Sequence, residues 1–202
     1  MLVLGELAAS ALGDSVDTVN LASNNDLGSG GLRDLVASDA GVRDALSTAD
    51  IITIGIGWND WQGPCQWLGL EVCMARNQDK VEQNLDATLD EIARLHEGQP
   101  AAIRVVTYAN PYPGDPGARV SFGLPRALPV EDLDTMFGKG LASFNGMLCD
   151  VAKRHAAACV DLVPVFNGPK GDQPIEDALR GSQAQMDLIA KTIDAAGYSP
   201  LP

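Results

Sequence analysis

Residues 50–57, which read Asp-Ile-Ile-Thr-Ile-Gly-Ile-Gly, decide the fold that we expect. Isoleucine favours extended backbone, and an apolar run without polar alternation is typical of a parallel strand that is covered on both faces. An amphipathic helix is predicted over residues 78–96, because apolar side chains recur there three or four positions apart. Residues 102–108 form the next apolar run. A strand, a helix and a further strand in this order predict a parallel sheet with helices packed against it.

Strands alternate with helices along the rest of the chain. Further helices are predicted at residues 2–12, 32–36, 42–46, 130–155 and 182–196, and further strands at residues 16–22 and 160–165. Pro164 has no backbone N–H to donate, so it must lie near the end or at an edge of its strand. The expected fold class is α/β, with three α/β/α layers and a parallel sheet of about four or five strands. The 202 residues suit a single domain spanning residues 1–202.

The composition excludes several classes of partner. A formal net charge of −13 repels the phosphate backbone of nucleic acids and anionic lipid headgroups. No apolar run approaches the roughly 20 residues that a membrane span needs. Residues 1–6 lack the basic region that begins a signal peptide. Neither a Cys-x-x-Cys pair nor a histidine cluster is present, so we expect no metal site and no cofactor.

Four cysteines form two local pairs. Cys65 and Cys73 lie in a predicted loop, whereas Cys149 and Cys159 lie on a helix and at the start of the strand that follows it. An even count in two pairs is compatible with two disulfides and an oxidising compartment. The alternative is four buried thiols, because a free cysteine packs as a small apolar residue. We favour a disulfide between Cys65 and Cys73 and leave the second pair open.

The candidate site lies where the strands end, because open parallel sheets bind ligands outside the carboxyl ends of their strands. The loops at this end are residues 23–31, 57–75, 110–129 and 166–181. In the second loop, Gly57-Trp58-Asn59-Asp60 follows directly on the first strand. Gly57 permits a tight exit from the strand, and the side chain of Asn59 can donate a hydrogen bond to an oxyanion. On these four residues alone, a simple Asx-type turn is the better explanation.

The wider sequence resembles the SGNH hydrolases, also called the GDSL-like lipase/acylhydrolase family. Residues 20–22 and the glycine-rich loop after them resemble the second block of the family, and residues 47–60 resemble its third block. Similar stretches follow in the family's order at residues 103–112, 160–169 and 182–190. The resemblance covers nearly the whole chain and is closest to secreted, disulfide-bearing esterase-like members. It therefore implies an extracellular protein with an SGNH/flavodoxin-like fold.

This resemblance implies a hydrolase in which a serine attacks the carbonyl of a carboxylic ester or acetyl group. A histidine acts as the base and an aspartate assists it. The oxyanion hole of the family uses backbone N–H groups at the serine and at the second-block glycine, together with the third-block asparagine side chain. Asn59 fits the asparagine role, and Gly28 or Gly30 fits the glycine role. The expected partner is a small ester or acylated substrate.

The serine block departs from the family pattern. The family carries Gly-Asp-Ser at the end of its first strand, and this chain has one such tripeptide, which ends at Ser15. Only residues 16–19 separate Ser15 from Asn20, which is too short for a helical crossover between parallel strands. A better alignment places residues 2–12 on the first helix of the family. The first strand and its serine would then precede Met1, and the tripeptide would be a coincidence.

The closing block departs as well. The family carries Asp-x-x-His-Pro before its last helix, whereas here Asp177 is followed three positions later by Arg180. Either Arg180 occupies the histidine position, or a few residues that include the Asp-His pair are deleted. An arginine stays protonated and cannot act as a base. The only histidines of the sequence, His96 and His155, each end a predicted helix, where a cation interacts favourably with the helix dipole. We interpret both as structural or solvated.

Two hypotheses follow. In the first, the chain is an SGNH-type ester hydrolase that is truncated or degenerate and has little activity. In the second, it is a non-catalytic relative that binds an ester- or glycan-like ligand, on which Trp58, Trp61 and Trp67 could stack. Packing within the loops explains these tryptophans equally well. Without the first strand, two sheet edges lose hydrogen-bond partners unless the predicted strands at residues 16–22 and 51–56 pair directly.

Overall fold

A computed structural model describes residues 2–22, 27–62, 70–113 and 130–201 of the chain. The strands alternate with helices, as the sequence predicts. In chain order the elements are α1 (Leu2–Leu12), α2 (Ser29–Ser38), α3 (Ala40–Ser47), β1 (Ile51–Ile54), α4 (Trp58–Gln62), α5 (Leu70–Leu95), β2 (Ala102–Val106), α7 (Val130–Arg154), β3 (Ala158–Val160), α8 (Val163–Asn167) and α9 (Gln183–Ala195).

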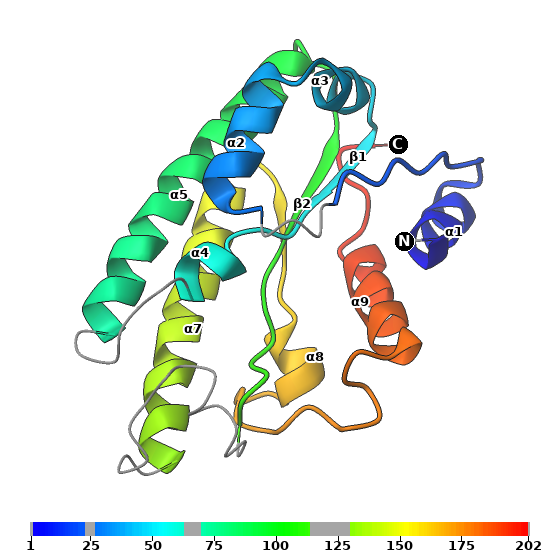
Figure 1. Cartoon of the computed structure of the whole chain (residues 1–202). Coiled ribbons are helices and arrows are strands. Elements are labelled where there is room, and N and C mark those ends of the chain that lie inside the picture. Colours follow the sequence, from blue (N-terminus) through cyan, green and yellow to red (C-terminus); the bar gives the residue numbers. More distant parts are fainter. Residues whose placement is uncertain (1, 23–26, 63–69, 114–129, 202) are drawn as a thin grey trace.

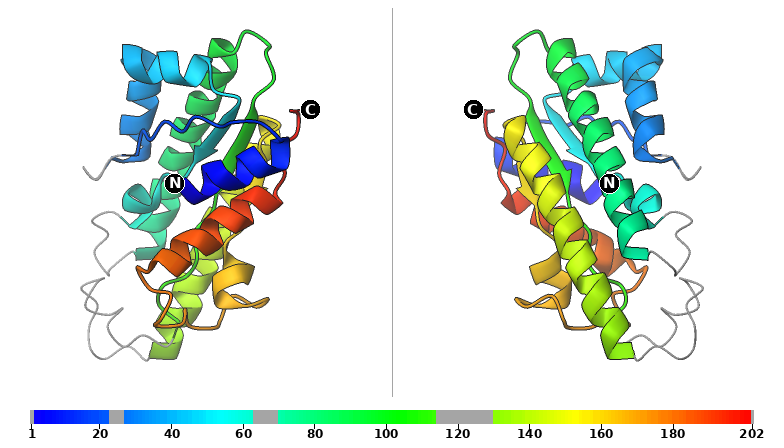
Figure 2. Two further views of the ribbon diagram at one scale, coloured as in Figure 1. Left: turned by 90° about the vertical axis from the view of Figure 1, so that its right-hand side faces the viewer. Right: turned by 90° about the vertical axis from the view of Figure 1, so that its left-hand side faces the viewer.

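The described strands form one parallel sheet in the order β1-β2-β3. Ile52 lies in register with Ile103, and Val105 with Cys159. Helices α5 and α7 cover one face of the sheet, and α1 and α9 lie on the other (Figure 1). Figure 2 shows each of these helix pairs from its own side of the molecule. The predicted α/β class with three layers and a parallel sheet is therefore confirmed.

Each face of the sheet has its own hydrophobic core. The larger core lies between the sheet and helices α5 and α7, and it includes Ile52, Ile54, Val81, Leu85, Leu89, Val105, Leu141, Phe144 and Leu148. The smaller core lies toward α8 and α9 and consists of Val106, Val160, Leu162, Phe166, Ile175 and Ile193. The apolar stripe predicted for residues 78–96 is buried, because it faces the larger core. Removal of this apolar surface from water stabilises the fold.

The predicted strand at residues 16–22 is absent from the described sheet. This segment has no ladder partner, and the side chain of Val19 is 66% exposed. Instead, the side chain of Asn20 accepts a hydrogen bond from the N–H of Ala22. Such a local bond competes with strand pairing. The alternative that this segment pairs directly with β1 is therefore wrong.

The predicted strand at residues 160–165 is also corrected. β3 ends at Val160, and Pro164 lies in the first turn of α8. The side chain of Asp161 accepts a hydrogen bond from the N–H of Val163, which fixes the change of direction. Proline fits the first turn of a helix because an N–H there has no intrahelical partner. The described sheet accordingly has three strands rather than four or five.

The predicted loop after β1 is partly helical. Residues 58–62 form α4, and α5 begins at Leu70, whereas the sequence predicted a loop up to residue 75. Met74 explains the early start, because its side chain is buried and lies against α7 at Gly140. Tertiary packing therefore extends α5 beyond the part that its periodicity predicts. No helix in the described ranges is long and apolar enough to cross a membrane.

Disulfides are present among the described cysteines. Cys149 of α7 is bonded to Cys159 of β3, with their Cα atoms 5.0 Å apart. Cys73 is also disulfide-bonded, and no described cysteine is a free thiol. The predicted partner of Cys73, Cys65, lies outside the described residues. The second pair, which the sequence left open, therefore forms a disulfide, and the alternative of four buried thiols is wrong.

The bond between Cys149 and Cys159 should stabilise the protein through the unfolded state. It joins residues separated by 10 positions. Closing such a loop lowers the entropy of the unfolded chain, which raises the free energy of the unfolded state by about 2–3 kcal/mol at room temperature. Replacing both cysteines by alanine should lower the free energy of unfolding by this amount. Urea denaturation of the wild type and of the double variant measures it. Equal stability would show that the bond contributes nothing.

Candidate functional site at the carboxyl ends of the strands

The chain leaves β1 at Gly57, whose backbone packs into the core. Its φ is +107°, in a region that side-chain-bearing residues rarely adopt. A Cβ atom there would lie 2.6 Å from Cγ1 of Val81 and 3.1 Å from Cζ of Phe144. Only glycine therefore fits both the conformation and the space. The carbonyl oxygen of Gly57 accepts a hydrogen bond from the N–H of Trp61, so α4 begins immediately after the strand.

Asp60, in the first turns of α4, joins this exit to the glycine-rich segment. Its Oδ2 accepts a 2.7 Å hydrogen bond from the N–H of Ser29, the first residue of α2. A Cβ atom on Gly28 would lie 2.7 Å from Oδ1 of Asp60, so the carboxylate lies directly against the Gly28 backbone. A carboxylate here satisfies an N–H at the end of the helix and interacts favourably with the helix dipole. Two segments that the sequence marked separately are thus brought together.

Asn84 of α5 fixes the start of α2 from the other side. Its Nδ2 donates a 2.9 Å hydrogen bond to Oγ of Ser29, and its Oδ1 accepts one of 2.8 Å from Arg33. The Ser29 side chain is buried, so its hydroxyl needs this partner. Sequence reasoning missed Asn84. The sequence feature that could have revealed Asn84 is a polar residue close to the apolar stripe of an amphipathic helix.

The chain segment after β2 is held by two asparagines that sequence reasoning also missed. Asn145 of α7 bonds both the N–H and the carbonyl of Tyr108, at 3.1 and 2.8 Å. Asn167 of α8 bonds the same two groups of Asn110, at 2.7 and 2.8 Å. Both asparagines are buried. Each side chain satisfies a backbone N–H and a carbonyl that would pair with a neighbouring strand in a wider sheet. These four bonds fix the backbone of the segment at Tyr108 and Asn110.

Aromatic rings fill the space between α4, α7 and the segment after β2. The rings of Trp58 and Tyr108 lie 5.1 Å apart, and Trp61 stacks on Phe144 at the same distance. Trp61 is 1% exposed, so it packs in the core as the alternative explanation expected. Trp58 is half-buried and remains accessible, whereas Trp67 lies outside the described residues. Burial raises the pKa of Tyr108 to about 12.

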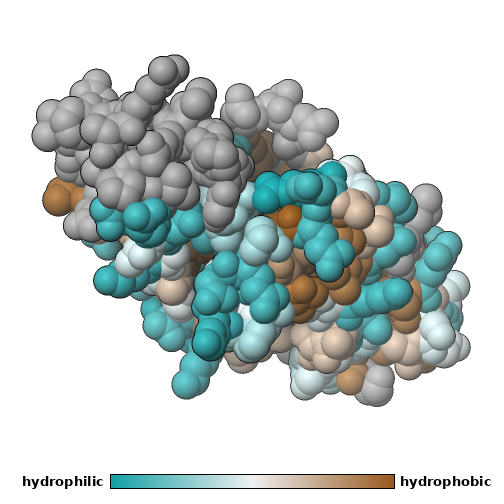
Figure 3. Space-filling view, turned by 90° about the horizontal axis from the view of Figure 1, so that it is seen from below, coloured by the Kyte–Doolittle hydropathy of each residue, from teal (hydrophilic) through white to brown (hydrophobic). Residues whose placement is uncertain are grey.

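The end of the molecule at which the strands finish also carries α4 and α8 (Figure 1). Figure 3 looks onto this end and shows a hydrophobic area bordered by hydrophilic side chains. Such a combination suits a ligand with an apolar part and a few polar groups.

The fold is similar to that of a lipase. The crystal structure of the lipase Lip_vut3 from a goat rumen metagenome matches with a TM-score of 0.71 and 16% sequence identity, over 100% of this chain and 88% of that chain. No protein-family model matches the sequence, and no curated protein matches it either. At this identity the likeness establishes the fold alone.

Within this lipase-like fold, the residues singled out from the sequence lie at different places. Asn59 is exposed in the first turn of α4, and Gly28 precedes α2 in extended conformation. Gly30 lies within α2, where a Cβ atom would be 3.6 Å from Nδ2 of Asn84. Ser15 is exposed after α1, outside any strand, and its N–H and hydroxyl both contact the carboxylate of Asp14.

The residues of the closing block lie in the turn before α9. Asp177 is fully exposed and lies 3.7 Å from Nε of Arg180. Arg180 also donates a 2.9 Å hydrogen bond to the carbonyl oxygen of Pro111, in the segment after β2. The guanidinium thus links the start of the last helix to the carboxyl end of the sheet. It holds this position as a structural donor and cannot accept a proton.

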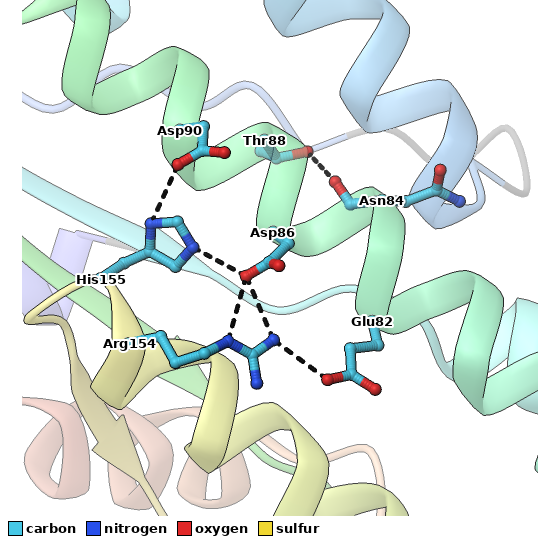
Figure 4. Close-up of polar contacts among 7 residues, drawn as sticks. All are labelled: Glu82, Asn84, Asp86, Thr88, Asp90, Arg154 and His155. Atoms are coloured by element: carbon cyan, nitrogen blue, oxygen red, sulfur yellow. Dashed lines mark hydrogen bonds and ion pairs between the residues drawn. The ribbon is translucent and has the colours of Figure 1, made fainter.

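Both histidines lie at the opposite end of the sheet. His96 precedes β2 and is buried, so the solvated interpretation is wrong for it. His155 precedes β3, and its Nε2 lies 2.8 Å from Oδ1 of Asp86 on α5. Figure 4 shows that Asp90 and Arg154 complete this contact between α5 and α7. The hydrogen bond from His155, followed by the contact with Arg154, lowers the pKa of Asp86.

The described residues contain no group of three or more histidine, cysteine, aspartate or glutamate side chains that could hold a metal ion. The polar groups at the carboxyl ends of the strands are hydrogen-bond donors, amides and carboxylates. These groups could hold a polar ligand through hydrogen bonds.

Replacing Gly57 by alanine should destabilise the protein by about 3 kcal/mol, as the sum of a left-handed backbone and the overlap with Val81 and Phe144. Gly55 offers a matched control two residues earlier, because it is exposed and a Cβ atom there meets nothing within 4 Å. Gly55→Ala should leave the free energy of unfolding nearly unchanged. Thermal or urea denaturation of both variants measures the difference, and equal effects would contradict the packing described at Gly57.

Tyr108 should ionise far above the ordinary range for tyrosine. The wild type minus Tyr108→Phe difference in absorbance at high pH should show a titration centred at about pH 12. The pKa of Tyr108 in the folded state lies above its unfolded value of about 10. The neutral side chain therefore makes its full contribution to stability below pH 10. The contribution is lost as the pH rises toward 12. A difference titration centred near pH 10 would contradict the burial of Tyr108.

Proposed function

We propose that the chain is an SGNH-type ester-hydrolase domain, spanning residues 1–202, that keeps the oxyanion-binding part of the site and has little hydrolytic activity. One observation carries this proposal. The donors lie at the carboxyl ends of the strands, whereas His96 and His155 lie at the amino ends of β2 and β3. A nucleophile and its base must lie within hydrogen-bond reach of each other.

The binding part of the proposed site consists of Asn59 and the Gly28 segment. Asn59 supplies a side-chain N–H₂, and Gly28 supplies the backbone N–H. Asp60 holds the backbone of the two segments together through its bond to Ser29. Fixed donors stabilise a developing oxyanion more than mobile ones do, because they need no reorganisation. The proposed ligand is a small carboxylic ester or acylated molecule.

The catalytic part of the proposed site is incomplete. Ser15 lies in an exposed segment and contacts Asp14, which cannot replace a histidine as the base for a hydroxyl at neutral pH. Arg180, three positions after Asp177, donates a hydrogen bond to the carbonyl oxygen of Pro111 and cannot act as a base. Asp177 is fully exposed and pairs with Arg180 instead of assisting a base. The disulfides are compatible with the proposed extracellular location.

Ligand binding without catalysis is the second candidate. It is favoured by Trp58, which adjoins Asn59 and is only half-buried although it contacts other rings. A partly exposed indole beside a polar donor suits an acylated sugar or an aryl ester. This candidate predicts a saturable change in tryptophan fluorescence on titration with such ligands, which Trp58→Phe removes.

Hydrolysis of p-nitrophenyl acetate tests the main proposal. The purified chain should show at most the roughly 10³- to 10⁴-fold acceleration that an oxyanion hole retains without its triad. Asn59→Ala should remove most of any residual rate, and Ser15→Ala should change nothing. Robust turnover that Ser15→Ala abolishes would show that Ser15 is the nucleophile and that the proposal is wrong.

A further inference from the structure

Arg104 of β2 is a buried arginine in the middle of the sheet. The residue is 1% exposed. Its neighbours in the strand, Ile103 and Val105, pack in the larger core, and successive side chains of a strand point to opposite faces. Arg104 therefore lies on the face that carries the smaller core, as Val106 does. Because a guanidinium stays protonated in proteins, this face contains a buried positive charge.

One edge of the Arg104 guanidinium makes no hydrogen bond. Nη1 donates a 2.8 Å hydrogen bond to the carbonyl oxygen of Ala102. Nε is buried and has no hydrogen-bond partner, and Nη2 has none within the described residues. Nε and Nη2 lie side by side on one edge of the planar group, and this pair of donors matches the two oxygens of a carboxylate or phosphate.

The charge of Arg104 is also without an ion pair among the described residues. Five other described arginines do pair with carboxylates: Arg33, Arg43, Arg94, Arg154 and Arg180. Burial lowers the pKa of Arg104, and the neighbouring Tyr198 and Asp194 offset this only in part. Holding a charge away from water without a paired countercharge costs free energy. The folded chain by itself therefore leaves this cation incompletely compensated.

The ring of Tyr198 covers the guanidinium. Cζ of Arg104 lies 4.7 Å from the centroid of this ring, which gives a cation–π attraction. Tyr198 follows α9, and its hydroxyl donates a 2.6 Å hydrogen bond to Oδ1 of Asp194 in the last turn of that helix. Tyr198 is itself only half-buried. The cover is thus a single side chain near the surface, which can rotate away from Arg104.

A further hydrogen-bond donor lies on the same face of the sheet. Thr53 of β1 is in register with Arg104, so both side chains point to this face. Thr53 is exposed, and its hydroxyl makes no hydrogen bond within the described residues. A hydroxyl is therefore available beside the arginine on the neighbouring strand.

We propose that Arg104 binds a small oxyanion, a carboxylate or a phosphate group, when the ring of Tyr198 moves aside. Nε and Nη2 donate to two oxygens of the anion, and the hydroxyl of Thr53 can donate to a third atom or through a water. The anion supplies the negative charge that the buried guanidinium lacks. The net charge of −13 opposes the approach of anions, so the expected affinity is modest, with a Kd of about 10 mM.

The effect of inorganic phosphate on stability gives the first test. Urea denaturation is measured in about 100 mM sodium phosphate and in sodium chloride of the same ionic strength. An anion that binds only the folded state with a Kd of about 10 mM should lower the unfolding constant of the wild type about tenfold. Arg104→Met removes the donors and should lose this tenfold effect.

A control is needed because phosphate also stabilises proteins through its exclusion from their surfaces. Arg94→Met removes an exposed arginine of α5 that is paired with Glu91. This variant should keep the full difference between phosphate and chloride. Whatever difference remains in Arg104→Met measures the general effect of phosphate.

NMR measures the binding directly. The Nε–H resonance of Arg104 should shift as phosphate is added to the folded wild type, and a parallel titration with acetate shows which of the two groups binds better. Asp194→Asn weakens the bond that holds Tyr198 and removes a nearby negative charge, so phosphate should bind at least about threefold tighter. Asp187→Asn, at an exposed position of the same helix, is the matched control and should leave the Kd unchanged.

Two results would overturn the proposal. The first is a wild type and an Arg104→Met variant that phosphate stabilises equally. The second is an Nε–H resonance of Arg104 that moves with neither phosphate nor acetate up to about 100 mM, ten times the expected Kd. The NMR titration uses the wild type, so it decides the question even if Arg104→Met does not fold.

Discussion

The backbone of Gly57 touches the side chains of Val81 and Phe144, and this close approach ties the end of β1 to both α5 and α7. A larger residue would push the strand away from the two helices that form the main core. The same glycine turns the chain into α4, which brings Asp60 to the start of α2. The packing of this glycine thus positions α2, α4, α5 and α7 relative to the end of β1.

The polar groups of the molecule are divided between the two ends of this sheet. Amide donors and fixed carboxylates gather where the strands finish, and the histidines lie where β2 and β3 begin. His155 is engaged by Asp86 and Asp90, so it contributes to the contact between α5 and α7. General-base catalysis requires the base within hydrogen-bond reach of the reacting group, and neither histidine lies at the carboxyl end of the sheet.

The sequence predicted those parts of the fold that depend on local patterns. Helices α1, α7 and α9 follow from the spacing of apolar residues, and strands β1 and β2 follow from continuous apolar runs. Ser182 caps α9, as expected for a serine before a helix. It failed where distant contacts decide. Residues 16–22 pair with no described strand, and Pro164 lies in the first turn of a helix. Within the candidate site, Gly57 could be recognised from the sequence as a tight exit from the strand, whereas the role of Asn59 stays a prediction. The roles of Asn84, Asn145 and Asn167 could not be recognised, because their partners are far away in the chain.

The proposed lack of hydrolytic activity requires that no activated serine lies at the carboxyl end of the sheet. Reaction with a fluorophosphonate, followed by intact-mass measurement and peptide mapping, tests this claim most directly, because such reagents label serines that a base has activated. The folded chain should acquire no adduct within the time in which an active serine hydrolase is fully labelled. Rapid formation of a single adduct on Ser15 would contradict it.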